Sequence, residues 1–167
     1  MKTVTSVLIV LLAWPLSASA QERNLSRGQG YVFFAAGVGN IGPGTANMQF
    51  GGGGEGFIYR GLGMGVEISP VMPWSTPSNL GVADFVIGLG SANVSYHILP
   101  ATNEHAVEPF LTAGYSLFFR AGAFHGYNAG GGINVWLNKK KAIRFEAREH
   151  RSRNYHTLGF RLGVTFR

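Results

Sequence analysis

The sequence has no cysteine, few charged residues and only one conspicuous apolar run. Without cysteine, the 167-residue chain cannot be a disulfide-stapled secreted scaffold, and we expect no lipid anchor on a cysteine. Charged residues make up 13% of the chain and hydrophobic residues 46%, which argues against intrinsic disorder. The apolar run at residues 7–16 is shorter than the roughly 20 residues of a membrane-spanning helix.

Glycine is abundant instead, with 25 residues, and 12 phenylalanines accompany it. Glycine scattered through aromatic-rich stretches opposes long helices, because it weakens a helix interior by about 1 kcal/mol relative to alanine. It is tolerated where strands curve tightly and backbones approach closely. The composition therefore favours an all-β protein.

The first twenty residues have the form of an export signal. Lys2 supplies a positive start, the apolar run follows, and Ala18-Ser19-Ala20 is an A-x-A cleavage site before Gln21. We therefore expect a signal peptide at 1–20 and one domain at 21–167. An exported chain without a membrane helix is periplasmic, secreted or a membrane barrel, and the pattern along the chain decides among these.

The remaining chain divides into eight apolar or small-residue segments separated by turn-rich connections. The predicted strands lie at 30–39, 48–59, 62–70, 84–98, 107–119, 127–137, 142–150 and 155–166. Most are about ten residues long, as a tilted membrane-spanning strand requires. The sequence therefore predicts an eight-stranded antiparallel up-and-down transmembrane β-barrel. Its second, fourth and sixth connections are expected to be periplasmic turns.

Apolar residues alternate with small or polar ones in several of these segments. The last segment shows the period best, because its apolar members recur at every second position: Leu158, Phe160, Leu162, Val164 and Phe166. A soluble barrel would show Lys, Glu and Asp on the other face, whereas here that face is largely Gly, Ser, Thr and Asn. Such residues suit the crowded interior of an eight-stranded barrel, so the apolar face is predicted to meet lipid.

By the same alternation, equal numbers of carboxylates and guanidinium groups face the interior. The predicted lumen residues are Glu55, Glu67, Glu146, Arg144, Arg148 and Arg161. Buried charges must be paired, because an isolated buried charge is strongly unfavourable. We therefore expect ion pairs that plug the lumen, and at most minute conductance if the protein is a narrow pore.

Aromatic residues near the strand ends suggest two membrane girdles. One set is assigned to the periplasmic side: Tyr31, Tyr59, Tyr96, Phe110, Trp136 and Phe166. The other set is assigned to the outer side: Trp74, Phe85, Phe119, Tyr127 and Tyr155. Trp74 lies in the longest outward connection and is the candidate contact with an external partner.

Together these features resemble the small outer-membrane barrels of OmpA and OmpX type. The resemblance covers residues 31–167 and includes Gly-Gly-Gly-Gly-Glu at 51–55. It implies a monomeric barrel in the outer membrane, among its lipids and lipopolysaccharide. The closing Leu162, Val164 and Phe166 look like the signal read by the barrel-assembly machinery, with one added residue, Arg167, and with Arg161 where a glycine is usual.

Cofactor, metal and nucleic-acid sites are not expected. Gly37-Val38-Gly39-Asn40-Ile41-Gly42 matches the dinucleotide fingerprint, but no helix pattern follows it. The five histidines lack metal-ligand spacing. The basic run at 139–141 is a solvated turn or a contact with anionic lipid, and it lacks the interleaved aromatics of a nucleic-acid surface.

One catalytic hypothesis remains beside the non-catalytic one. His150-Arg151-Ser152 resembles the His-x-Ser of PagL-type lipid A deacylases, in which histidine would be the general base and serine the nucleophile. That family has an acidic residue further along the chain, and no Asp or Glu follows Glu149 here. The preferred interpretation is a non-catalytic barrel with a structural or surface-interaction role, and the alternative is a lipid A deacylase.

Overall fold

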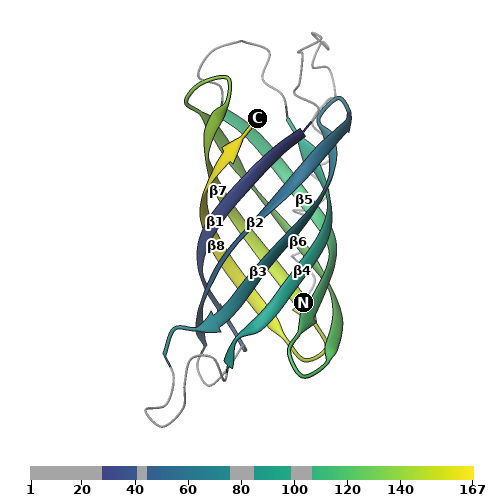
Figure 1. Cartoon of the computed structure of the whole chain (residues 1–167), viewed down its shortest axis with the longest axis vertical. Coiled ribbons are helices and arrows are strands. Elements are labelled where there is room, and N and C mark those ends of the chain that lie inside the picture. Colours follow the sequence, from purple (N-terminus) through teal and green to yellow (C-terminus); the bar gives the residue numbers. More distant parts are fainter. Residues whose placement is uncertain (1–27, 41–44, 76–84, 99–106) are drawn as a thin grey trace, which may run out of the picture.

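The eight predicted strands form one closed barrel. The structure, a computed structural model, describes residues 28–40, 45–75, 85–98 and 107–167, so the predicted signal peptide lies outside the described residues. The strands are β1 (Gly28–Gly39), β2 (Ala46–Tyr59), β3 (Leu62–Pro73), β4 (Ile87–His97), β5 (Val107–Phe119), β6 (Ala123–Trp136), β7 (Lys141–Ser152) and β8 (His156–Phe166). Each pairs antiparallel with the next, and β8 returns to pair with β1 (Figure 1). The predicted eight-stranded antiparallel fold is confirmed.

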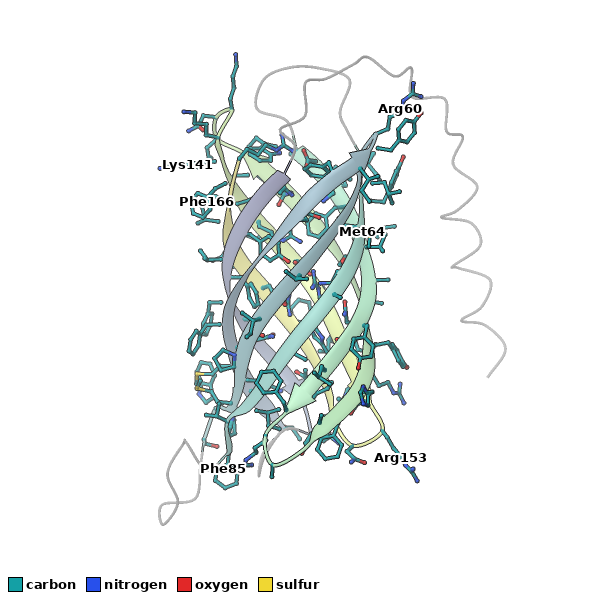
Figure 2. All side chains as sticks on the ribbon, turned by 45° about the vertical axis from the view of Figure 1, so that its right-hand side comes forward. Arg60, Met64, Phe85, Lys141, Arg153 and Phe166 are labelled. Atoms are coloured by element: carbon teal, nitrogen blue, oxygen red, sulfur yellow. The ribbon has the colours of Figure 1, made fainter. Side chains whose placement is uncertain are left out.

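The connections alternate between the two ends of the barrel. The end of β8 and the β2–β3 and β6–β7 turns lie at one end of the barrel, as Phe166, Arg60 and Lys141 show, whereas Phe85 and Arg153 lie at the opposite end (Figure 2). We call the first the terminal end and the second the far end. The described ranges contain no helix long and apolar enough to cross a membrane.

The β2–β3 hairpin has the two-residue turn Arg60-Gly61. Both residues have positive φ, 37° and 86°, as a type I′ turn requires. Gly61 meets this need without strain, and a Cβ atom there would also collide with the carbonyl oxygen of His97. Arg60 also adopts a positive φ, which is intrinsically unfavourable for a residue that has a Cβ atom.

Side chains alternate between the lumen and the outer wall, except at the end of β2, where the register shifts between Phe57 and Tyr59. Large apolar residues cover the outside, where Val66 and Phe160 are each 67% exposed. The lumen instead holds buried Asn, Ser, Thr, Gln, Glu and Arg side chains. This arrangement inverts that of a water-soluble barrel, and it follows from the two-residue period of each strand.

Three aromatic residues assigned to the periplasmic girdle point the other way. Tyr31, Phe110 and Trp136 are buried in the lumen, so their assignment to a membrane girdle is wrong. Strand parity places them there, because each is two residues from another buried position: Phe33, Thr112 and Asn134 respectively. The glycines of β2 provide the space, since a Cβ at Gly53 would lie 2.8 Å from the Tyr31 hydroxyl.

Candidate functional site

The lumen contains a network of buried charges at mid-height, which we call the central cluster: Glu67, Glu146, Arg148 and Arg161. Arg161 Nη1 lies 2.9 and 3.0 Å from the two Glu67 carboxylate oxygens, and Arg148 Nη1 lies 3.1 Å from Glu67 Oε2. Arg148 also donates through Nε to Glu146. All four side chains are 1% exposed, so the pairs are shielded from water.

One of these ion pairs crosses the full width of the barrel. Glu67 belongs to β3 and Arg148 to β7, which are four strands apart in a ring of eight and therefore face each other. Tyr31 of β1 also donates its hydroxyl to Glu67, at 3.1 Å. The cluster thus joins opposite walls and occupies the space that a pore would need.

A second group lies nearer the terminal end, and we call it the terminal cluster: Glu55, His97, Glu108 and Arg167. The two ring nitrogens of His97 lie 2.8 Å from a Glu108 oxygen and 3.1 Å from a Glu55 oxygen. Arg167 Nη2 lies 2.8 Å from Glu108, which also accepts from the Trp136 indole at 3.1 Å. Ser95 and Gln29 donate to Glu55.

Arg144 lies between the two clusters. Its Nε is 2.9 Å from Glu146 and its Nη1 is 3.9 Å from Glu55. The guanidinium carbon is 3.9 Å from the Phe110 ring centre and 4.4 Å from that of Tyr31. Such cation–π contacts gain strength when the site is desolvated, so the inward aromatics help to hold the charge.

The far end of the lumen is filled by an apolar cluster: Val71, Ile87, Leu89 and Phe118, with Phe124 and Tyr155 packed against it. The Phe118 and Tyr155 rings are stacked with centroids 5.6 Å apart. At the terminal end, Arg167 lies over the Trp136 ring at 3.8 Å. Both ends of the lumen are therefore occupied by packed side chains.

The structure places all six predicted lumen residues inside the barrel and joins them through the contacts above. Sequence reasoning missed His97 as an ion-pair partner, and it did not assign Glu108 or Arg167 to the lumen. Strand alternation could have placed Glu108 in the lumen. It lies two residues before Phe110 and four before the polar Thr112, so all three side chains point to the same face of the strand. With these additions, the described residues place four carboxylates and four guanidinium groups in the lumen: Glu55, Glu67, Glu108, Glu146, Arg144, Arg148, Arg161 and Arg167.

The two residues of the catalytic hypothesis make separate hydrogen bonds. His150 is buried in the lumen, where Arg161 Nη2 donates to its Nε2 and its Nδ1 lies 2.9 Å from the Ser116 hydroxyl. Since Arg161 can only donate, Nδ1 carries the proton and has no lone pair to receive one from a serine. The Ser152 hydroxyl instead lies within the β7–β8 turn, accepting from Tyr155 N at 2.9 Å.

Two further expectations concern exposure and metal binding. Trp74, just after β3, is 59% exposed and its backbone N–H donates to the Ala46 carbonyl at 3.0 Å. In the part of the chain that the structure describes, no three histidine or acidic side chains are grouped to hold a metal ion. Two hollows, of about 400 and 320 Å³, lie on the wall among outward residues such as Gly54, Met64 and Phe145.

Solved structures with the same architecture include small barrels of the outer membrane. Neisserial surface protein A is 14% identical, with a TM-score of 0.66 over 84% of this chain and 97% of that one. The N-terminal β-barrel domain of Pseudomonas aeruginosa OprF is 15% identical, with a TM-score of 0.57 over 83% and 98%. Outer membrane protein OprG of Pseudomonas aeruginosa is 10% identical, with a TM-score of 0.56 over 84% and 95%.

The chain shares their fold. These identities relate folds and do not extend to activities or partners. No protein-family model matches the sequence, and no curated protein matches it either.

Proposed function

We propose that this protein is an integral outer-membrane barrel with a non-conducting, non-catalytic lumen and a role in membrane structure or surface interaction. The observation that carries the proposal is the inversion of the barrel, with large apolar side chains outside and paired charges inside. In water, so large an apolar surface would drive association. In a bilayer it meets hydrocarbon, and the closed ring of strands leaves no unpaired edge.

Val66→Arg tests this location directly. Val66 is near the middle of β3 and faces outward, so arginine there would enter the bilayer midplane and cost about 2–4 kcal/mol of folding free energy. The control is Ala121→Arg, in the exposed turn between β5 and β6, where a change within about 0.5 kcal/mol is expected.

The readout is the urea midpoint of protein refolded into phospholipid vesicles, followed by the gel mobility shift between unboiled and boiled samples. Cell fractionation on a density gradient then tells outer from inner membrane. Equal midpoints for the two variants, or recovery of the folded protein in a soluble fraction, would overturn the proposed location.

The end of β8 supports the expected interaction with the barrel-assembly machinery. Leu162, Val164 and Phe166 all face outward, where another protein can reach them. Phe166→Ala should lower the yield in the outer membrane while leaving refolding into vesicles unchanged. Phe160→Ala, on the same face of the same strand, is the matched control and should retain the yield.

Trp74 supports an external contact, because it is exposed at the far end beside the outward connections. Iodide should quench its fluorescence from the aqueous phase, whereas brominated lipid should not. Subtracting the signal of Trp74→Phe removes the contribution of buried Trp136. Quenching by brominated lipid would place Trp74 within the membrane and end its candidacy as a contact with soluble partners.

A further inference from the structure

Four outward side chains form a continuous row across β5, β6, β7 and β8, near the far end of the barrel. Tyr115 is the cross-strand neighbour of Tyr127, Tyr127 of Arg151, and Arg151 of His156. The two tyrosines are exposed, the Arg151 side chain is 60% exposed, and that of His156 is half-exposed. The positions next to them in sequence are buried in the lumen: Ser116, Asn128, His150 and Thr157.

The position of Arg151 along β7 places the Arg151–His156 end of the row at a membrane surface. Cross-strand partners lie on a line perpendicular to the strands, so with a strand tilt of about 40° the row slopes by roughly 9 Å and its Tyr115 end lies deeper in the bilayer. Lys141 and Arg151 both face outward and are separated by ten residues, with Ile143, Phe145, Ala147 and then Glu149 on the same face between them. For a strand tilted by about 40°, ten residues rise roughly 25 Å, which is the height of the apolar band of such barrels. Lys141 therefore marks one edge of this band, and Glu149 with Arg151 marks the other.

The row offers hydrogen-bond donors and positive charge, and its neighbouring carboxylate lies too far away to form short ion-pair hydrogen bonds with them. Glu149 Oε1 lies 3.9 Å from Arg151 Nη1 and 3.4 Å from His156 Nε2, beyond ideal ion-pair hydrogen bonds. The Tyr115 hydroxyl is bound to His125, which fixes that end of the row. Among the described residues exposed at this end, Arg120, Arg151 and Arg153 against Glu149 give 3 − 1 = +2.

We propose that this row binds the phosphorylated sugar headgroup of a glycolipid in the outer leaflet. Arg151 would pair with a phosphate through its planar fork of donors, with His156 beside it. The two tyrosines, which lie below Arg151, would pack their rings against the upper part of the acyl chains, and the Tyr127 hydroxyl would bond to polar groups of the headgroup. Three strand spacings make the row about 14 Å long, so it extends from the headgroup into the acyl layer and suits a whole lipid better than a lone phosphate. The inference rests on the proposed outer-membrane location.

The test measures binding of lipid A, bearing both phosphates, to the folded full chain in detergent micelles, by native mass spectrometry. Arg151→Gln should lower the affinity about tenfold, because a charge-assisted hydrogen bond is lost. Lys141→Gln is the matched control, on the same face of the same strand at the opposite edge, and should leave the affinity unchanged. Glu149→Gln should raise it, because a competing carboxylate is removed.

Three results would overturn the inference: equal losses for Arg151→Gln and Lys141→Gln, equal affinity for dephosphorylated lipid A, or equal competition by phosphatidylglycerol. The last would assign the row to phosphate in general and not to a glycolipid headgroup. The gel mobility of each sample shows separately whether the barrel is folded. A barrel that inserts but does not discriminate among these lipids rejects only this inference, whereas failure to insert rejects the proposed function.

Discussion

Glu67 holds the two walls of the lumen together, so Glu67→Gln is the most informative perturbation of the interior. Its carboxylate accepts hydrogen bonds from Arg161, Arg148 and Tyr31, at 2.9–3.1 Å. Glutamine keeps the shape and one carbonyl oxygen but removes the charge. Two guanidinium groups would then lose a shared counter-ion in a site with 1% side-chain exposure.

The expected loss is large because the remaining charges cannot reach water. Removing one partner of a buried ion pair costs about 3–5 kcal/mol. The lower end applies here, about 3 kcal/mol, because glutamine retains an acceptor and Glu146 still pairs with Arg148. Glu149→Gln makes the same chemical change on the outer face, where Glu149 is 43% exposed and an ion pair contributes about 1 kcal/mol at most.

The assay is urea unfolding of both variants in phospholipid vesicles, with stability taken from the midpoint and slope. A double variant with Arg161→Gln should lose less than the sum of the single losses, because each change removes the same contact. If Glu67→Gln and Glu149→Gln lose equal stability, the lumen is hydrated enough to screen its charges, and the plugged interior is refuted.

Three further substitutions probe other parts of the molecule. Arg60→Asn should stabilise the barrel by up to about 1 kcal/mol, because asparagine adopts positive φ more readily than arginine. The same urea midpoint measures this gain, and no gain would mean that the turn is free of strain. Arg144→Lys should lower the free energy of unfolding by about 1–2 kcal/mol, since lysine lacks the planar guanidinium group that lies against Phe110 and binds Glu146. An unchanged urea midpoint would show that only the positive charge matters. Cells expressing the wild type and cells expressing His150→Ala should give the same mass spectrum of lipid A, because Arg161 donates to the ring nitrogen that a general base would need. Loss of one acyl chain in the wild-type cells alone would support the deacylase hypothesis.

The fold could be predicted because strand alternation is a local property that each segment carries independently. The apolar face of residues 158–166 is visible in the sequence, and the structure turns that face outward. The end of β4 was predicted well but its start was placed three residues early, at 84 and not at Ile87. Local pattern therefore fixes which residues form strands and which face they take, but less well where each strand begins.

The partners of the lumen charges could not be predicted in the same way, because they depend on distance across the barrel. Glu108 and His97 are neighbours only through the β4–β5 pairing, and Arg167 joins them from β8. The aromatic assignments failed for a related reason. Nearness to a strand end suggests a girdle position for Tyr31. Its side chain points into the lumen because it alternates with outward residues along β1 and because Gly53 has no side chain to block it.

The cross-lumen pair of Glu67 and Arg148 leads to the last prediction, that the barrel conducts no ions. A pore must leave a water path between opposite walls, and this pair joins β3 to β7 with 3.1 Å between donor and acceptor. Phe118→Ala removes part of the far-end apolar cluster but leaves the central cluster in place, so it too should show no channels in a planar bilayer. Glu67→Gln combined with Phe118→Ala weakens both of these barriers while the terminal cluster stays in place, so it is the variant most prone to leak. Resolved single channels from the wild type would mean that the network opens in the membrane. If only the double variant conducts, the native lumen is closed, and the outer wall and the far-end connections are the surfaces through which this protein acts.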